Sequence, residues 1–258
     1  MPSQIKIISL VACVMLPAVS AWGDEPPPPP PQNVWTGKGQ AGYTSSSGNS
    51  EGKSANAAID MAYLDDPWKQ AFHLGGLYGQ SAGIVSAERW DTSWQTNYNF
   101  TANLYTFGLL TYQHDLFSGF DYQASASAGL GYKIIATPTT QLDAQAGVGY
   151  QVLRPENIVK NPDGSVASRM LLPSENGVAE TAAINYSQAL TKTTTLTDKL
   201  AVTSSSADTL VTNALAVAVK ISTKLALSAG YALQDNSKPP AGLKHVDTLE
   251  TLNLVYSF

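Results

Sequence analysis

The chain has 258 residues, with 15 Lys and Arg against 20 Asp and Glu, and a net charge of −5. A mildly acidic chain lacks the electrostatic footprint of a nucleic-acid-binding protein, so we exclude nucleic acid as a partner. Its single cysteine excludes a disulfide framework, and its three histidines show no paired spacing, so we expect neither a metal nor a cofactor.

The first 21 residues have the layout of a secretory signal peptide. Met1–Lys6 is polar with one positive charge, Ile7–Ala18 is apolar, and Val19–Ala21 offers small residues for cleavage. A lipoprotein box ending at Cys13 is the alternative, but it would leave too short an apolar core before the cysteine. We therefore predict a signal peptide over residues 1–21, cleaved during export.

A proline-rich segment follows over residues 22–34. Its six consecutive prolines, Pro26–Pro31, cannot donate backbone hydrogen bonds and favour a stiff polyproline II rod. This segment is either a ligand for a proline-binding domain or a periplasmic linker. We favour the linker.

From residue 35 onward, no apolar run reaches the roughly 20 residues that a membrane-spanning helix needs. Apolar and polar residues alternate instead. In Gln141–Gln151, for example, Leu142, Val148 and Tyr150 share one face, and Asp143 lies on the other. Strands of about ten residues that are apolar outside and polar inside are typical of transmembrane β-barrels.

Twelve such stretches can be placed, and an even number returns both ends of the barrel to the periplasmic side. They lie near Trp35–Ser46, Ser54–Tyr63, Trp68–Gln80, Val85–Tyr98, Leu104–His114, Tyr122–Ile134, Gln141–Val152, Val178–Ala189, Thr195–Thr203, Leu210–Ile221, Leu225–Gln234 and Thr248–Phe258. We therefore predict an all-β fold, a single closed antiparallel transmembrane β-barrel of about 12 strands over residues 35–258.

The connections agree with this count, since the predicted periplasmic turns are all short and the longest connection, Leu153–Gly177, falls outside. Its prolines and glycines interrupt regular pairing, which predicts an irregular loop. The loop either folds into the lumen or stands above the membrane as a contact surface that exposes Met170–Leu172. We favour the second arrangement, in which protease would cut near Arg169.

The last strand carries Leu252, Leu254, Tyr256 and Phe258 on one face. Lipid can cover such a face when the strand closes a barrel. We expect Tyr256 and Phe258 to form the signal that the outer-membrane barrel-assembly machinery reads during biogenesis. The expected location is the bacterial outer membrane, with its lipid as the surrounding partner.

Several short motifs resemble those of the YdiY-like salt-induced outer-membrane proteins (domain of unknown function 481). They are Ser47–Glu51, Ala87–Trp90, Asp115–Gln123, Gly129–Tyr132, Gly147–Tyr150, Asp235–Pro240, Asp247–Thr248 and Tyr256–Phe258. The resemblance implies a twelve-stranded barrel and a salt-response role, but no established activity or substrate. Leu153–Gly177 departs from it by being longer and more apolar.

Charged and amide side chains should face the lumen, because charge on the lipid side costs roughly 2–4 kcal/mol at mid-depth. The predicted lumen-lining residues are Asp60, Glu88, Arg89, Gln123, Asp143, Gln145, Gln151 and Glu250. They either line a conduit or form a hydrogen-bonded network that fills the barrel. The small barrel favours the network.

The sequence favours a structural or envelope-stress role without enzymatic activity, together with a narrow passage for small polar solutes. One alternative is a lipid-acting barrel enzyme, with His245 and Asp247 joined by a serine at the outer rim. No serine has the sequence context of a nucleophile, which counts against it. Another alternative is a surface receptor or adhesin that acts through Leu153–Gly177.

Overall fold

The computed structural model describes residues 33–46, 52–239 and 243–258, so the predicted signal peptide and nearly all of the proline-rich linker lie outside the described residues. Within these ranges, no helix has the length and apolar character needed to cross a bilayer. The strands are β1 (Val34–Ser46), β2 (Gly52–Asp65), β3 (Trp68–Ser81), β4 (Ile84–Asn99), β5 (Leu104–Asp115), β6 (Phe120–Ala136), β7 (Thr140–Lys160), β8 (Val166–Leu171), β9 (Glu175–Ala189), β10 (Thr194–Ser205), β11 (Thr209–Lys220), β12 (Leu225–Asn236) and β13 (Val246–Ser257).

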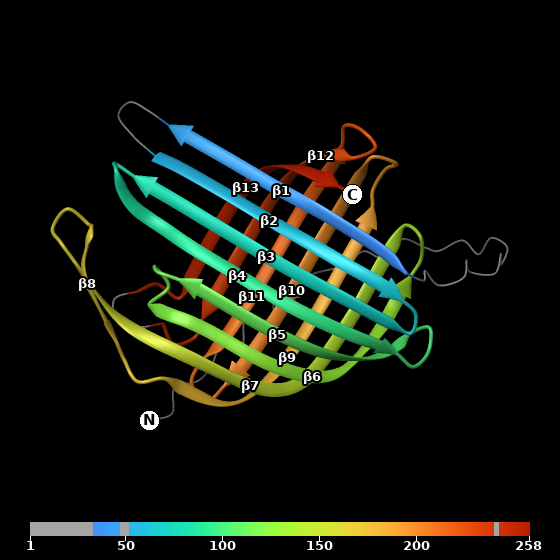
Figure 1. Cartoon of the computed structure of the whole chain (residues 1–258), viewed down its shortest axis with the longest axis horizontal. Coiled ribbons are helices and arrows are strands. Elements are labelled where there is room, and N and C mark those ends of the chain that lie inside the picture. The colour runs from blue at the N-terminus through green and yellow to red at the C-terminus, as the bar shows by residue number, and fades with distance from the viewer. Residues whose placement is uncertain (1–32, 47–51, 240–242) are drawn as a thin grey trace, which may run out of the picture. The chain divides into compact units, whose positions relative to one another are not determined.

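Twelve of these strands form one closed antiparallel wall, as Figure 1 shows. Each pairs with its neighbour along the chain; β7 pairs with β9, and β13 returns to β1. Tight turns set the register. Ala82 and Gly83, both with positive φ, join β3 to β4 as expected for a two-residue hairpin. The predicted fold class is confirmed.

The wall is polar inside and apolar outside. On β6, Leu130 and Tyr132 are exposed on the outer face, whereas Gln123 and Ser127 are buried on the inner face. Exposed apolar side chains circle the outer surface, among them Leu74, Leu110, Leu130, Val148, Ile184, Leu200, Val217, Leu227 and Leu254. This distribution is that of a barrel surrounded by lipid.

Aromatic side chains mark two levels on the outer face. Trp35 packs on Tyr63, and Trp68 on Tyr98, near the end where β1 begins and β13 finishes. Near the other end, Trp90, Tyr112 and Tyr122 stack across β4, β5 and β6. Such belts lie at the two membrane–water interfaces. We call the first end the short-turn end and the second the long-loop end.

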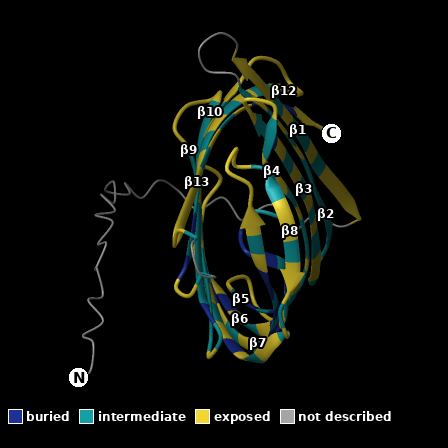
Figure 2. Ribbon diagram, turned by 90° about the vertical axis from the view of Figure 1, so that its left-hand side faces the viewer, coloured by how far each residue is buried: buried dark blue, intermediate teal, exposed yellow. Residues whose placement is uncertain are grey.

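The long connection differs from its prediction as an irregular loop. β7 continues to Lys160 and pairs with β8, so the two strands form a hairpin that projects beyond the wall (Figures 1 and 2). The turn signals were correct only at its tip, where the amide of Asn161 donates to the carbonyl of Ser165. Pro155 stays within β7, beside a register shift in β6, where a missing N–H is tolerated.

Glycines of β6 leave room for close contacts with β5 and β7. A Cβ on Gly129 would lie 2.1 Å from the carbonyl oxygen of Ala146, and one on Gly131 would lie 2.1 Å from the ring of Tyr105. Strands β6 and β7 can therefore approach closely, and the Tyr105 ring can lie flat on the inner face.

Candidate functional site

Six of the eight predicted lumen-lining residues lie on the inner face of the wall: Asp60, Arg89, Gln123, Asp143, Gln145 and Gln151. The prediction was wrong for Glu88 and Glu250, which lie on the outer face. Glu88 is paired with Tyr78 and precedes the inward Arg89, whereas Glu250 is paired with Tyr231. Both lie towards the long-loop end, where interfacial depth reduces the penalty for a lipid-side charge to about 0–1 kcal/mol.

An ion cluster is built around His73 on three adjacent strands. Its Nδ1 lies 2.7 Å from Asp60 Oδ1, and its Nε2 lies 3.0 Å from Asp91 Oδ2. Both contacts are hydrogen bonds only when both ring nitrogens carry protons, so this geometry fits an imidazolium between two carboxylates. Lys38 and Arg89 extend the cluster, at 3.5 Å from Asp60 and 3.9 Å from Asp91.

More cations surround the inner cavity nearest the short-turn end. This cavity has a volume of about 610 Å³, and its lining includes Lys38, Lys69 and Lys199 together with Asp60 and His73. Lys199 comes from β10, on a different part of the wall from β1–β3. The lumen is therefore rich in positive charge at this end, although the whole chain is acidic.

A second polar group surrounds Asp143. Its carboxylate accepts hydrogen bonds from Tyr105 Oη at 3.1 Å and from Asn185 Nδ2 at 3.0 Å. Gln95 Nε2 donates to Gln145 Oε1 at 3.1 Å in the same region. These contacts join β4, β5, β7 and β9 on the inner face. This part of the lumen is filled by the kind of network that barrel size had suggested.

Three cavities nevertheless adjoin along the lumen. An outer cavity of about 500 Å³ contains Asp115 and Asp247, and it shares Arg89 with a middle cavity of about 260 Å³. His73 lines both the middle cavity and the 610 Å³ cavity nearest the short-turn end. Across from these charges, the middle cavity is lined by small residues of β11 and β12: Ala214, Ala216, Ser228, Gly230 and Ala232. Small side chains on one wall leave space beside the charged wall.

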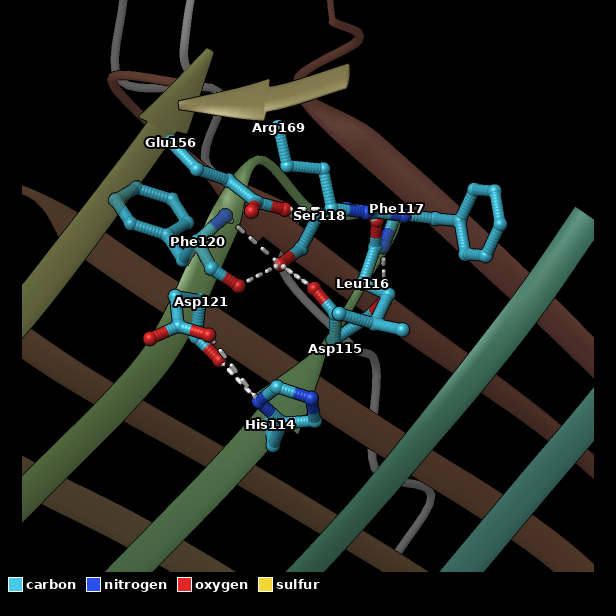
Figure 3. Close-up of polar contacts among 9 residues, drawn as sticks. All are labelled: His114, Asp115, Leu116, Phe117, Ser118, Phe120, Asp121, Glu156 and Arg169. Carbon is cyan, nitrogen blue, oxygen red and sulfur yellow. Dashed lines mark hydrogen bonds and ion pairs between the residues drawn. The ribbon is translucent and has the colours of Figure 1, made fainter. Parts of the chain in front are cut away.

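The outer rim holds a separate anchor for the β7–β8 hairpin (Figure 3). Arg169 of β8 donates to Glu156 Oε1 at 2.5 Å and to the carbonyl of Leu116, and its guanidinium lies 5.4 Å from the centre of the Phe117 ring. Glu156 is only 1% exposed. The geometry does not favour the expected protease cut near Arg169, because this side chain is engaged in the anchor.

The neighbouring motif Asp115–Asp121 forms the β5–β6 turn. Asp115 Oδ1 accepts the amide of Phe117 at 2.9 Å (Figure 3). The carbonyl of Gly119 accepts the amide of Glu156 at 2.8 Å. This motif, which carried part of the family resemblance, therefore closes a turn and supports the hairpin.

His245, the candidate for a hydrolytic site, contacts the backbone carbonyl of Asn236 through Nδ1 at 2.9 Å. Within the described residues, its ring makes no hydrogen bond to a serine. These same ranges contain no group of three or more His, Cys, Asp or Glu side chains arranged to hold a metal ion.

Sequence reasoning missed Lys38, Lys69, His73 and Lys199 as lumen residues. A usable signal existed for His73, because the turn at residues 66–67 sets the β2–β3 register and pairs it with Asp60. No comparable local pattern in the sequence predicts that Lys199 lines the same cavity.

Comparison with known proteins places the chain in a family. A family model described as "Protein of unknown function, DUF481" matches residues 39–258. The chain belongs to the DUF481 family. Among curated proteins, none matches this DUF481 chain.

Several solved structures are similar to this DUF481 protein. An outer membrane channel from Pseudomonas putida F1 is 11% identical, with a TM-score of 0.47, covering 88% of this chain and 96% of its own. The NanC porin is 11% identical, with a TM-score of 0.45 and coverage of 87% and 99%. The translocator domain of autotransporter NalP from Neisseria meningitidis is 16% identical, with a TM-score of 0.42 and coverage of 87% and 86%.

Proposed function

We propose that this protein is an outer-membrane barrel that passes small polar solutes through its lumen and favours anions. The observation that carries this proposal is the series of three adjoining cavities, with cations gathered in the cavity nearest the short-turn end. On this proposal the short turns lie in the periplasm. No reaction on the solute is needed, so the protein acts as a passage rather than an enzyme.

The preference for anions follows from the fixed charges. In the cavity nearest the short-turn end, Lys38, Lys69, Lys199 and an imidazolium at His73 face the lumen against one carboxylate, Asp60. Farther out, Arg89 faces Asp91, and the outer cavity adds Asp115 and Asp247, so the preference is set at the short-turn end. A cleft lined mainly by one sign of charge raises the local concentration of the opposite ion. The middle cavity of about 260 Å³ limits passage to small solutes.

The same charges support an envelope role under salt stress as a finer proposal. Screening shortens the reach of fixed charges from about 10 Å at 0.1 M salt to about 3 Å at 1 M. Selectivity of the lumen should therefore fall as external salt rises. A deletion strain that grows normally at high osmolarity, with unchanged uptake of small anions, would count against this role.

Liposome swelling tests the passage. Proteoliposomes should admit lactate faster than glycerol, and glycerol faster than ethanolammonium, three small solutes that differ in charge. The variant Lys69→Gln/Lys199→Gln should reduce the lactate advantage, because it removes cations that lie outside the Asp60–His73–Asp91 bridge. Swelling no faster than that of protein-free liposomes would refute the passage, and fastest entry of ethanolammonium would refute the preference for anions.

A further inference from the structure

The closing seam between β1 and β13 is paired over only part of its length. β1 pairs with β2 at all 13 of its positions, but with β13 only from Lys38–Ser257 to Ala41–Leu254. Two reciprocal backbone hydrogen bonds of 3.0 Å join Gly37 to Phe258 and extend this ladder by one position. The other wall seams hold between 11 and 15 paired positions.

The ladder stops where two asparagines reach across β1. Asn56 Nδ2 of β2 donates to Asn253 Oδ1 of β13 at 2.8 Å, on the lumen side of Gly42. A Cβ on Gly42 would lie 2.3 Å from Asn253 Oδ1, so only glycine leaves room for this contact. The side chains of Asn56 and Asn253 are therefore hydrogen-bonded across β1 where its backbone ladder to β13 ends, and we call this pair the clasp.

Beyond the clasp, residues 43–46 of β1 have no backbone ladder to β13 within the described ranges. Tyr43 and Leu252 would be the next outward pair, and they are 66% and 71% exposed. Without a ladder, this part of the seam is open rather than sealed wall.

A groove of about 560 Å³ lies at this opening. Its lining includes Leu215, Val217, Tyr231 and Leu252 of the outer face, one carboxylate, Glu250, and Thr44 of β1. Five of its residues also line the middle lumen cavity: Leu215, Ala216, Gly230, Tyr231 and Thr251. These five residues lie on the paired strands β11, β12 and β13, so the groove and the lumen cavity occupy opposite sides of the same stretch of wall, and the lumen side carries His73, Arg89 and Asp91. Thr44 lines the groove from across the unpaired seam.

We propose that the unpaired half of the β1–β13 seam is a lateral portal between the lumen and the outer leaflet, used by a single-chain amphiphile with an anionic headgroup. The apolar groove takes the chain, since it already lies within the surrounding lipid. The headgroup passes between Thr44 and Thr251 towards the cations of the lumen. This inference adds a second route and solute class to the proposed aqueous passage.

The test uses radiolabelled dodecanoate and the barrel in nanodiscs. Thr44→Cys/Thr251→Cys, oxidised, should close the portal, because the pair would continue the present register on the lumen face. The matched control is Gln40→Cys/Val255→Cys, which joins positions that are already paired. Thr44→Trp blocks the opening without needing it to close. We expect saturable binding by the unmodified protein and by the oxidised control. The oxidised Thr44/Thr251 variant and Thr44→Trp should each bind at least tenfold more weakly.

Hydrogen exchange tests the seam itself. The amides of Tyr43 and Ser45, which point towards β13, should exchange much faster than the corresponding amides of Gly39 and Ala41 in the paired stretch. Equal protection of the two stretches would overturn the portal, as would absent dodecanoate binding or equal binding by the closed and control variants. Both readouts are independent of ion flow, so a failed aqueous passage and a failed portal give different results.

Discussion

The anchor of the β7–β8 hairpin makes a quantitative prediction. Arg169→Ala would leave the carboxylate of Glu156, which is 1% exposed, without its cation. Removing one partner of a buried ion pair costs about 3–5 kcal/mol. Because β8 pairs only with β7 and lies outside the closed wall, the hairpin should open while the barrel stays folded.

At about 1.4 kcal/mol per factor of ten, this loss should speed amide exchange in Val166–Leu171 by at least a hundredfold, up to the limit of full opening. Hydrogen exchange in nanodiscs measures it. The control Glu156→Gln/Arg169→Ala removes both charges and should recover most of the protection. Unchanged exchange in Arg169→Ala, or equal acceleration in the single and double variants, would refute the reasoning.

Three further predictions concern the wall. Gly131→Ala should lower the free energy of unfolding in urea by about 1–3 kcal/mol, because its methyl group would meet the Tyr105 ring. Gly39→Ala, with open space around its Cβ, should be nearly neutral, and equal urea midpoints for the two variants would contradict this packing. Ala214→Trp, at the junction of the middle and outer cavities, should reduce single-channel conductance several-fold, whereas Val219→Trp on the outer face should not; equal conductance would place the route elsewhere. Deleting Phe258 should reduce the folded, heat-modifiable fraction in the outer membrane, since its backbone closes the seam, while export continues; a normal folded yield would remove its role in assembly.

The strand count and the faces of most strands could be predicted from sequence, because alternation with period two states directly which side chains share a face. Gln123 and Gln145 reach the inner face for this reason. The errors at Glu88 and Glu250 arose from treating charge as a sign of inward direction. Leu252 had already been assigned to the lipid face, and Glu250 shares its parity.

The β7–β8 hairpin and the lysine-rich cavity could not be read from the sequence in the same way. Proline and glycine report local turns, as at Pro162 and Gly164, but they do not exclude a strand that runs past Pro155. Lys69 and Lys199 line the same cavity only because the barrel closes, and closure depends on pairing between distant segments. The short β1–β13 ladder likewise has no sequence signal, since both strands alternate normally.

The most direct test of the account is the reversal potential of single channels in planar bilayers under a tenfold KCl gradient. Because cations line the lumen, we expect the reversal potential to have the sign that chloride selectivity gives. In Lys69→Gln/Lys199→Gln it should move towards zero. A reversal potential of the sign for potassium preference, or the absence of any conductance above that of the bare bilayer, would contradict it.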